Sequence, residues 1–252
     1  MFRLPAATWI ASLALLGAAT AAGAADDANF SIIGFSPDAR YFAFEQYGYE
    51  DGSGAGFWEI DIIDLKTDEW VQGSPVTIRT DDEDPPLLSK VRAAAMEQAG
   101  PILQAVNITE PGEILAANPA TEVVDDRTRI TFDREYVSMG SMPSGDTYIR
   151  HELAVTPMPL PQPAACDPED GDQAVGFTLT LKAIKRDFTH AIHTDKAIPR
   201  SRGCPVGYDL TAVVAHAGYP DEDRMVAIVG VYQRGWEGAN HRYIAVPFVL
   251  SD

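Results

Sequence analysis

The amino-acid sequence predicts a mainly β fold of antiparallel sheets, arranged as a propeller-like structure or as a two-sheet sandwich, with one α-helical insertion near residues 87–107. Three observations support this prediction. Short segments in which apolar and polar residues alternate recur along most of the chain, and a period of two residues is typical of strands covered on one face. Clusters of Gly, Pro, Asp and Asn, which favour turns, separate these segments. One stretch between them repeats its apolar residues at helical spacing.

The first 24 residues have the features of a secretory signal peptide. Arg3 precedes an apolar stretch over residues 4–16, and small residues follow up to Ala22-Gly23-Ala24. A basic start, an apolar centre and a small-residue site predict cleavage after residue 24. The alternative, an uncleaved membrane anchor, would need roughly 20 strongly apolar residues. We therefore expect residues 25–252 to form a single β-rich domain that is secreted or periplasmic.

The segment from residue 29 to residue 71 predicts four short antiparallel strands joined by polar turns. The strands are expected at residues 29–35, 41–47, 58–63 and 69–71. In the third strand, three apolar residues alternate with Glu59, Asp61 and Ile63. This pattern suits a sheet that is covered on one face and partly exposed to water on the other.

Two pieces of this segment, "FSPDARYFAF" and "IDIIDLKTDEW", resemble the repeat of TolB-type and related β-propellers. Glycine usually follows Ser-Pro-Asp in that repeat, whereas this chain has Ala39. The resemblance implies one blade of a propeller, and a propeller consists of several blades. The motif occurs once here, so both the propeller-like arrangement and the sandwich stay open.

The helical insertion is predicted because apolar residues between Leu88 and Val106 recur at helical spacing. Pro101 is expected to end or kink this helix near Gly100. Its apolar stripe is expected to pack into the core. The β pattern then resumes at Arg129–Asp133, Thr147–Thr156, Val175–Ile184, Tyr208–His216, Met225–Tyr232 and Arg242–Leu250. Prolines at 157, 159, 161 and 163 predict an extended surface crossing.

The two cysteines, Cys166 and Cys204, are predicted to form a disulfide. A secreted chain meets conditions in which thiols oxidise, and the number of cysteines is even. A free buried pair and a metal site are the alternatives, and structural zinc would need further Cys or His residues nearby. The bridge would close a loop of about 38 residues and stabilise the fold by roughly 3 to 4 kcal/mol. It would join the starts of two strands that could be neighbours in one sheet.

The composition is strongly acidic. The chain has 37 Asp and Glu against 19 Lys and Arg, a net charge of −18, and loss of Arg3 with the leader makes the mature chain more negative. Binding to nucleic acid requires clustered Lys and Arg, whereas the charge runs here, residues 81–84, 167–172 and 221–223, are acidic. Such runs are typical of solvated loops. The composition thus excludes a nucleic-acid partner, and no later apolar stretch predicts a membrane span in the mature chain.

A second resemblance covers nearly the whole mature chain. "FSPDARYFAFEQYG", "PRSRGCPVGYDL" and "GWEGANHRYIAV", in this order, resemble a family of predicted secreted bacterial proteins that share a domain of unknown function. The resemblance implies a secreted protein with no assigned activity. It supplies no catalytic residue to carry over.

The familiar catalytic signatures are missing from the sequence, so no catalytic residue, metal or cofactor is predicted. The string "HAIHTD", with His190, His193 and Asp195, resembles a metal-binding spacing, but residues three apart on a strand point to opposite faces. Calcium binding by the acidic loops near residues 50–54 and 167–173 stays open, although neither matches the usual loop motif. Paired carboxylates for glycoside hydrolysis leave no sequence signature either.

The strongest candidate for recognition is the loop "GWEGANHR", in which Trp236, Asn240 and Arg242 lie close together. An aromatic ring with an amide and a guanidinium can stack on and hydrogen bond to a sugar or a protein partner. The alternative is that the Trp packs on its own sheet. We expect first a binding or interaction module for a protein or glycan partner, and second a hydrolase acting on a cell-envelope polymer. Whether the chain is an enzyme stays open, with binding favoured.

Overall fold

The computed structural model describes residues 25–50, 53–80, 87–135, 148–166, 173–184, 188–218, 224–235 and 238–250. Its elements in chain order are β1 (Asn29–Phe35), β2 (Tyr41–Tyr49), β3 (Gly56–Asp64), β4 (Glu69–Trp70), β5 (Val76–Arg79), α1 (Leu88–Ala105), β6 (Gly112–Ala117), β7 (Arg129–Glu135), β8 (Tyr148–Pro159), β9 (Val175–Ala183), β10 (Phe188–Thr194), the 3₁₀ helix η3 (Arg200–Arg202), β11 (Pro205–His216), β12 (Arg224–Arg234) and β13 (Ala239–Val249).

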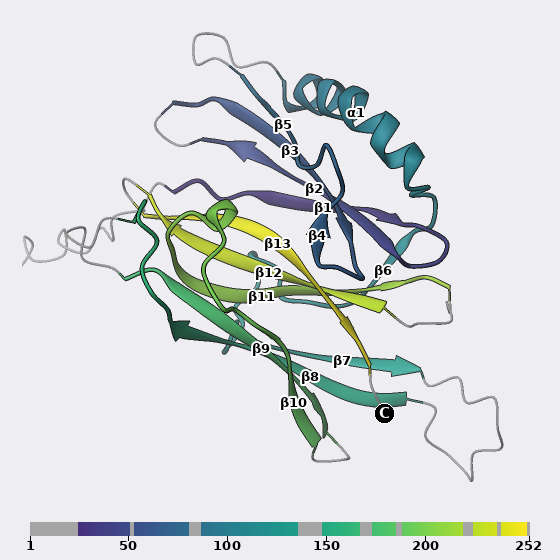
Figure 1. Ribbon diagram of the computed structural model, residues 1–252, viewed down its shortest axis with the longest axis vertical. Helices are drawn as coiled ribbons and strands as arrows, with labels where there is room; N and C mark the ends of the chain where they lie inside the picture. Colours follow the sequence, from purple (N-terminus) through teal and green to yellow (C-terminus); the bar gives the residue numbers. More distant parts are fainter. Residues whose placement is uncertain are drawn as a thin grey trace, which may run out of the picture.

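The strands form three antiparallel sheets that are stacked as layers (Figure 1). The N-terminal sheet has the order β1-β2-β3-β4, and β5 pairs with the other half of β3. The central sheet has the order β13-β12-β11-β6, and the outer sheet has the order β10-β9-β8-β7. Helix α1 covers the face of the N-terminal sheet that points away from the central sheet.

The central sheet is buried on both faces. Along β11, Val213 and Ala215 belong to the core shared with the outer sheet, whereas Ala212 and Val214 belong to the core shared with the N-terminal sheet. All four side chains are fully buried. A strand covered on both sides is an almost continuous apolar run, and "LTAVVAH" in β11 has this form.

Face-to-face packing makes the protein a sandwich of sheets, and the resemblance to a TolB-type propeller repeat is not supported. The segment from residue 29 to residue 70 does form the predicted four-strand antiparallel meander. Its inner face packs against the central sheet through Phe35, Phe42 and Phe57, so no neighbouring blade is required to cover it. The predicted mainly β, antiparallel fold with one helical insertion is confirmed.

Two local predictions need correction, because packing outweighs the effect of proline. Of the two outcomes expected at Pro101, an end of the helix is contradicted: α1 continues to Ala105, and Leu103 is buried in the cluster beneath the helix. Strand β8 extends through Pro157 and Pro159, which were expected in a surface crossing. Both prolines pair with β9 on one side and lie beyond the last residue of β8 that pairs with β7, so their missing N–H groups fall on an open edge.

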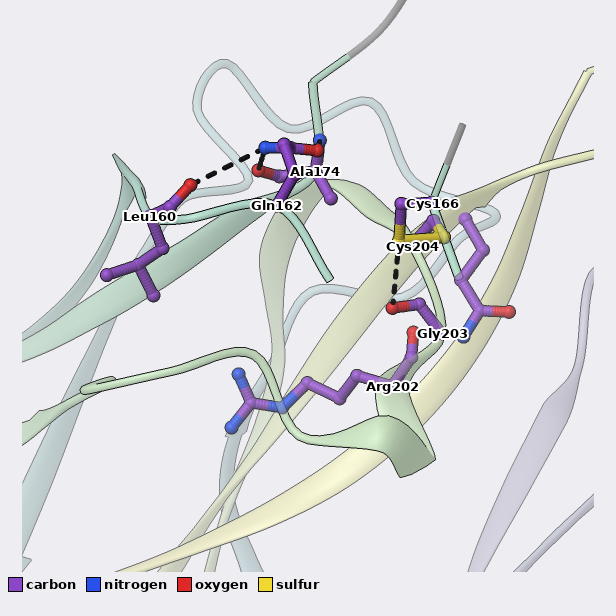
Figure 2. Close-up of a disulfide and its surroundings, with 8 residues drawn as sticks. Leu160, Gln162, Cys166, Ala174, Arg202, Gly203 and Cys204 are labelled. Carbon is purple, nitrogen blue, oxygen red and sulfur yellow. Dashed lines mark hydrogen bonds between the residues drawn. A yellow bond between two sulfur atoms is a disulfide. The ribbon is translucent and has the colours of Figure 1, made fainter. Parts of the chain in front are cut away.

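The predicted disulfide is present, with a Cα–Cα distance of 5.6 Å between Cys166 and Cys204 (Figure 2). The strands that follow the two cysteines, β9 and β11, lie in different sheets and are not neighbours in one sheet. The bridge therefore ties the crossing after β8 to the loop that contains η3. Gln162 fixes the same crossing, because its amide exchanges hydrogen bonds of 2.8 and 2.9 Å with the backbone of Ala174.

Candidate functional site

A groove of about 1090 Å³ opens between the N-terminal sheet and the edge of the central sheet. We call it the inter-sheet groove. Its floor is formed by β2 and β3, one wall by β13, and the opposite wall by residues 193–202, which include η3. The disulfide at Cys204 anchors the end of that second wall.

The floor is polar because two acidic residues interrupt the otherwise apolar inward face of β3. Side chains at alternate positions of a strand share one face. On the face of β3 toward the central sheet, Phe57 and Ile63 are buried in the shared core, and Glu59 and Asp61 lie between them. The two sheets thus cannot close through apolar contact at this point, and the groove begins here.

Gln46 on β2 organises the two acids. Its Nε2 donates to Glu59 Oε1 at 2.9 Å and lies 3.3 Å from Asp61 Oδ2 and 3.2 Å from the carbonyl oxygen of Tyr243. Its Oε1 accepts a hydrogen bond of 3.0 Å from the backbone N–H of Tyr243. One amide therefore joins both carboxyl groups to strand β13. Because an amide nitrogen carries two hydrogens, the three acceptors share its donors.

The two carboxyl groups differ in their surroundings. Asp61 is 4% exposed, and its Oδ1 accepts a hydrogen bond of 3.0 Å from the indole N–H of Trp70. Burial, and then repulsion by Glu59, raise the pKa of Asp61 well above its usual value. Glu59 is only half-buried, and its Oε2 accepts a hydrogen bond of 2.8 Å from Thr77. Within the described part of the chain, neither carboxyl group forms an ion pair.

The rim of the groove presents an aromatic ring and cations. Trp70 is 47% exposed, and its hydrogen bond to Asp61 fixes the ring at the edge of the floor. Arg242 on β13 lies over the ring of Phe57, with 4.2 Å between the guanidinium carbon and the ring centroid, and forms an ion pair of 3.4 Å with Asp26. Lys196, on the opposite wall, is exposed to solvent.

The opposite wall is held by Asp195. This buried carboxylate accepts hydrogen bonds from both terminal nitrogens of Arg202, at 2.5 and 2.9 Å, and one of 2.9 Å from the N–H of Phe177. Burial alone would raise its pKa, but the hydrogen bonds from His193 and Arg202 lower the pKa of Asp195 to about 2. His193 also lies 3.7 Å from Asp68 of the N-terminal sheet, so an ion pair can form across the groove when His193 is protonated.

A family model described as "Predicted secreted protein (DUF2259)" matches residues 43–248. The chain belongs to this family. The matched residues contain most of β2, all of β3 and both cysteines, and therefore the floor of the groove and the disulfide. The family description agrees with the secreted location that the signal peptide predicts. Neither a curated protein nor a solved structure gives a significant match.

Among the described residues of this family member, no helix is long and apolar enough to span a membrane. The same residues contain no group of three or more His, Cys, Asp and Glu side chains arranged to hold a metal ion. In the string "HAIHTD", His193 is engaged by Asp195 at 3.0 Å. The acidic run at residues 167–172 and residues 51–52, which were considered for calcium, lie outside the described residues.

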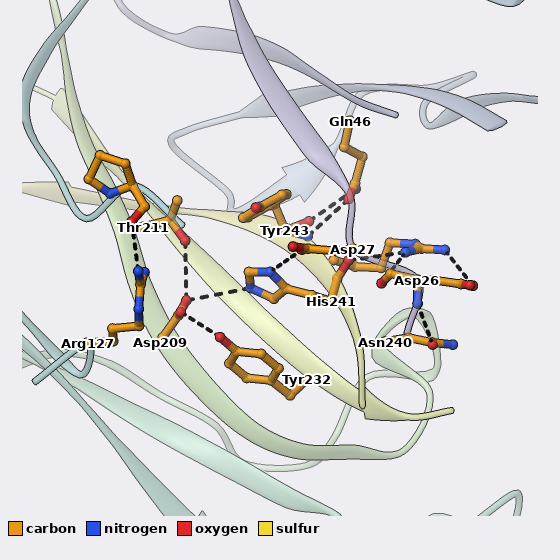
Figure 3. A network of polar contacts seen from close by, with 12 residues as sticks. Asp26, Asp27, Gln46, Arg127, Asp209, Thr211, Tyr232, Asn240, His241 and Tyr243 are labelled. Atoms are coloured by element: carbon orange, nitrogen blue, oxygen red, sulfur yellow. Dashed lines mark hydrogen bonds and ion pairs between the residues drawn. The ribbon is translucent and has the colours of Figure 1, made fainter. Parts of the chain in front are cut away.

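Of the three residues predicted to form a recognition loop, two lie in the described part of the chain. Trp236 lies outside the described residues. Asn240 and Arg242 belong to strand β13, and both bind Asp26: Asn240 Oδ1 accepts a hydrogen bond of 3.1 Å from the N–H of Asp26 (Figure 3). Arg242 also lines the inter-sheet groove, so one of the predicted residues does reach the candidate site.

A second polar cluster lies around His241 of β13 (Figure 3). Its Nδ1 is 3.0 Å from Asp27 Oδ1, and its Nε2 is 3.7 Å from Asp209 Oδ1. Although burial alone would lower it, these two carboxylates raise the pKa of His241. Tyr232 donates a hydrogen bond of 2.9 Å to Asp209 and stacks on the imidazole. Together with the backbone bonds between residues 26–28 and His241, the cluster fastens the N-terminal segment to the central sheet.

The His241 cluster depends on Gly230. A Cβ atom at this position would lie 2.1 Å from Asp209 Oδ1 and 2.2 Å from His241 Nε2. A cavity of about 330 Å³ borders the cluster, and Ala25, which becomes the first residue after the predicted cleavage, lines it. The cluster therefore holds residues 26–28 against the central sheet.

Sequence reasoning missed Glu59, Asp61, Gln46 and Trp70 as site residues. The signal was visible in "FWEIDII", because two acids occupy one face of an otherwise apolar strand. The alternation was interpreted as a face exposed to water. In the structure the central sheet covers this face. The sequence does not reveal this, because Tyr243, which binds Gln46 from the central sheet, is 197 residues away along the chain.

Proposed function

We propose that this secreted protein binds a glycan, and that the inter-sheet groove holds several consecutive sugar units of it. The observation that carries the proposal is the exposed ring of Trp70, held through its indole N–H by Asp61 at the edge of a floor that also contains Glu59 and Gln46. The aromatic ring can contact the C–H groups of a sugar while the polar side chains hydrogen bond to its hydroxyl groups.

Sugars offer hydroxyl donors around the ring and a flat patch of C–H groups on one face. Carboxylate oxygens are strong acceptors for such hydroxyls, since charge-assisted hydrogen bonds are the stronger class. A large aromatic ring that is fixed in place offers contact area at a low cost in conformational entropy. Glu59, only half-buried, faces the groove as an acceptor, and Trp70 at the rim supplies the apolar surface.

The shape of the groove favours a glycan over a folded protein partner. Its volume of about 1090 Å³ is slightly above the range of roughly 300–1,000 Å³ that is usual for small-molecule sites, which suits a chain of several sugar units. Protein interfaces instead rely on a cluster of apolar anchors at their centre, whereas the centre of this floor is occupied by two acids.

The charge of the protein favours a neutral glycan. The whole chain carries a net charge of −18, and Glu59 in the floor has no paired cation among the described residues. A polyanion would be repelled over the Debye length of about 8 Å at physiological ionic strength. Arg242 offers little compensation, because it is already paired with Asp26.

A binding panel tests the proposal. Mature protein, residues 25–252, is applied to immobilised hexamers of β-1,4-linked N-acetylglucosamine, β-1,4-linked glucose and α-1,4-linked glucose, and to insoluble peptidoglycan. We expect retention of at least one member, and at least a tenfold weaker affinity in Trp70→Ala, which corresponds to about 1.4 kcal/mol.

Tyr49→Ala is the matched control. Tyr49 is an aromatic residue of the same sheet with a similar exposure of 48%, and it does not line the groove. The control should bind as the unmodified protein does. Retention of no panel member, or equal losses in the two variants, would contradict the proposal, and capture of a protein from envelope extract through Trp70 would favour a protein partner instead.

A further inference from the structure

We infer that the inter-sheet groove also hydrolyses the glycan that it holds, with Asp61 as the general acid and Glu59 as the nucleophile at a glycosidic bond. This inference rests on the proposed glycan binding. It is carried by the position of two carboxyl groups, held by one amide, at the floor of a groove large enough for several sugar units.

The separation of the two groups suits a reaction through a covalent intermediate. Glu59 Oε1 and Asp61 Oδ2 lie 2.9 and 3.3 Å from the same nitrogen of Gln46. These two oxygens can therefore be at most about 6 Å apart, which is compatible with the roughly 5–5.5 Å between the carboxyl groups of retaining glycosidases and shorter than the roughly 6.5–9.5 Å of inverting ones.

The surroundings of the two groups assign their roles. Two carboxyl groups in one site can divide acid and nucleophile between them when their environments differ. Asp61 is the more deeply buried, and both burial and the charge of Glu59 favour its protonated form. Glu59 accepts hydrogen bonds from Gln46 and Thr77, two neutral donors that position a carboxylate without neutralising it.

The first step breaks the bond between the anomeric carbon and the glycosidic oxygen. Asp61 gives its proton to that oxygen, which leaves as a hydroxyl group of the departing sugar. A carboxylate oxygen of Glu59 forms an ester bond to the anomeric carbon with its own electron pair. The site then holds a glycosyl ester on Glu59 and an ionised Asp61.

The second step consumes one water molecule. The water oxygen attacks the anomeric carbon, Asp61 takes one proton from the water, and the ester bond to Glu59 breaks with its electrons returning to the carboxylate. Both side chains regain their starting states, and the new reducing end has the configuration of the original bond.

The experiment uses the same four panel members and measures retention and new reducing ends separately, between pH 4 and pH 8. We expect the unmodified protein to release reducing ends from a member that it retains. Asp61→Asn and Glu59→Gln should each lower the turnover at least 100-fold, the scale of general acid catalysis, while retention persists. Glu97→Gln is the control for charge, because Glu97 is exposed on α1, on the far side of the N-terminal sheet.

Each result decides between the two proposals. Retention that depends on Trp70 without any reducing ends overturns hydrolysis and leaves glycan binding in place. Cleavage that survives in both floor variants also overturns the assigned roles. Should either variant fail to fold, the stereochemistry of the unmodified protein still decides: proton NMR of the first product should show the retained anomer, and the inverted anomer would contradict the roles of the two acids. Absence of retention from the whole panel overturns both proposals together.

Discussion

Replacement of Gly230 by alanine should destabilise the protein by roughly 3 to 5 kcal/mol, because it displaces a buried charge network rather than only crowding a strand. The added Cβ would lie 2.1 Å from Asp209 Oδ1 and 2.2 Å from His241 Nε2. Both side chains are almost fully buried, at 3% and 8% exposure, so at least one has to leave its position. Overpacking alone costs about 1–3 kcal/mol, and the larger figure includes separation of the two charges.

Gly207→Ala provides the matched control for this prediction. Gly207 lies on β11, which pairs with the β12 strand of Gly230, and its nearest neighbours are atoms of Tyr232 at 3.8 and 4.0 Å from an added Cβ. The control should change the free energy of unfolding by less than about 1 kcal/mol. Urea denaturation followed by tryptophan fluorescence measures both variants. Equal midpoints for the two alanine variants would refute the reasoning that Gly230 makes room for the His241 cluster.

Three further predictions concern the His241 cluster, the Glu45–Arg92 contact and the disulfide. Because the pKa of His241 is raised in the folded protein, the stabilisation it provides is complete below the unfolded value of about 6.5 and is lost as the pH rises through the folded value. Denaturation at pH 6 and pH 9 should show a fall that is smaller in His241→Gln, and an unchanged fall would exclude His241 as its source. Arg92→Met should cost about 2 kcal/mol, since the buried Glu45 keeps its 2.9 Å hydrogen bond from Trp58 but loses the Arg92 contacts at 3.0 and 3.1 Å. A cost near zero would mean that Glu45 is satisfied by Trp58 alone. Reduction of the disulfide, which spans 38 residues, should lower the free energy of unfolding by about 4 kcal/mol. A mature protein with two thiols that react with iodoacetamide before reduction would contradict the pairing.

Local sequence patterns were sufficient to predict most of the strands and their antiparallel pairing. The segment at residues 41–47 falls within β2, and Tyr208–His216 falls within β11. Strands β5, β6 and β10 were missed because their patterns are weak: β5 has four residues, and β6 lies between turn signals at Pro111-Gly112 and Asn118-Pro119. The alternation of apolar and polar residues also does not reveal how sheets stack. The sequence therefore could not distinguish three stacked sheets from a propeller or from a two-sheet sandwich.

The candidate site was harder to predict than the fold, because it forms between parts that are distant in the sequence. Glu59 and Asp61 come from the N-terminal sheet, and the wall at Asp195 and Arg202 follows more than one hundred residues later. A pair of acids on one strand becomes a candidate site only when a second sheet covers it and leaves a groove. The disulfide, in contrast, could be predicted from the number of cysteines and the compartment alone.

The environment of the Trp70 indole tests the central claim most directly. The N–H of Trp70 donates to Asp61 in the groove, whereas the N–H of Trp58 donates to Glu45 on the opposite face of the same sheet, beneath α1. Residues 25–252 contain three Trp residues, and in a ¹H–¹⁵N NMR spectrum the indole signals of Trp70 and Trp58 therefore report on the groove and on an internal control. On titration with the glycan that the panel identifies, we expect the Trp70 signal to shift in a saturable manner while the Trp58 signal stays in place. A Trp70 signal that stays unchanged at saturating glycan would contradict binding in the inter-sheet groove.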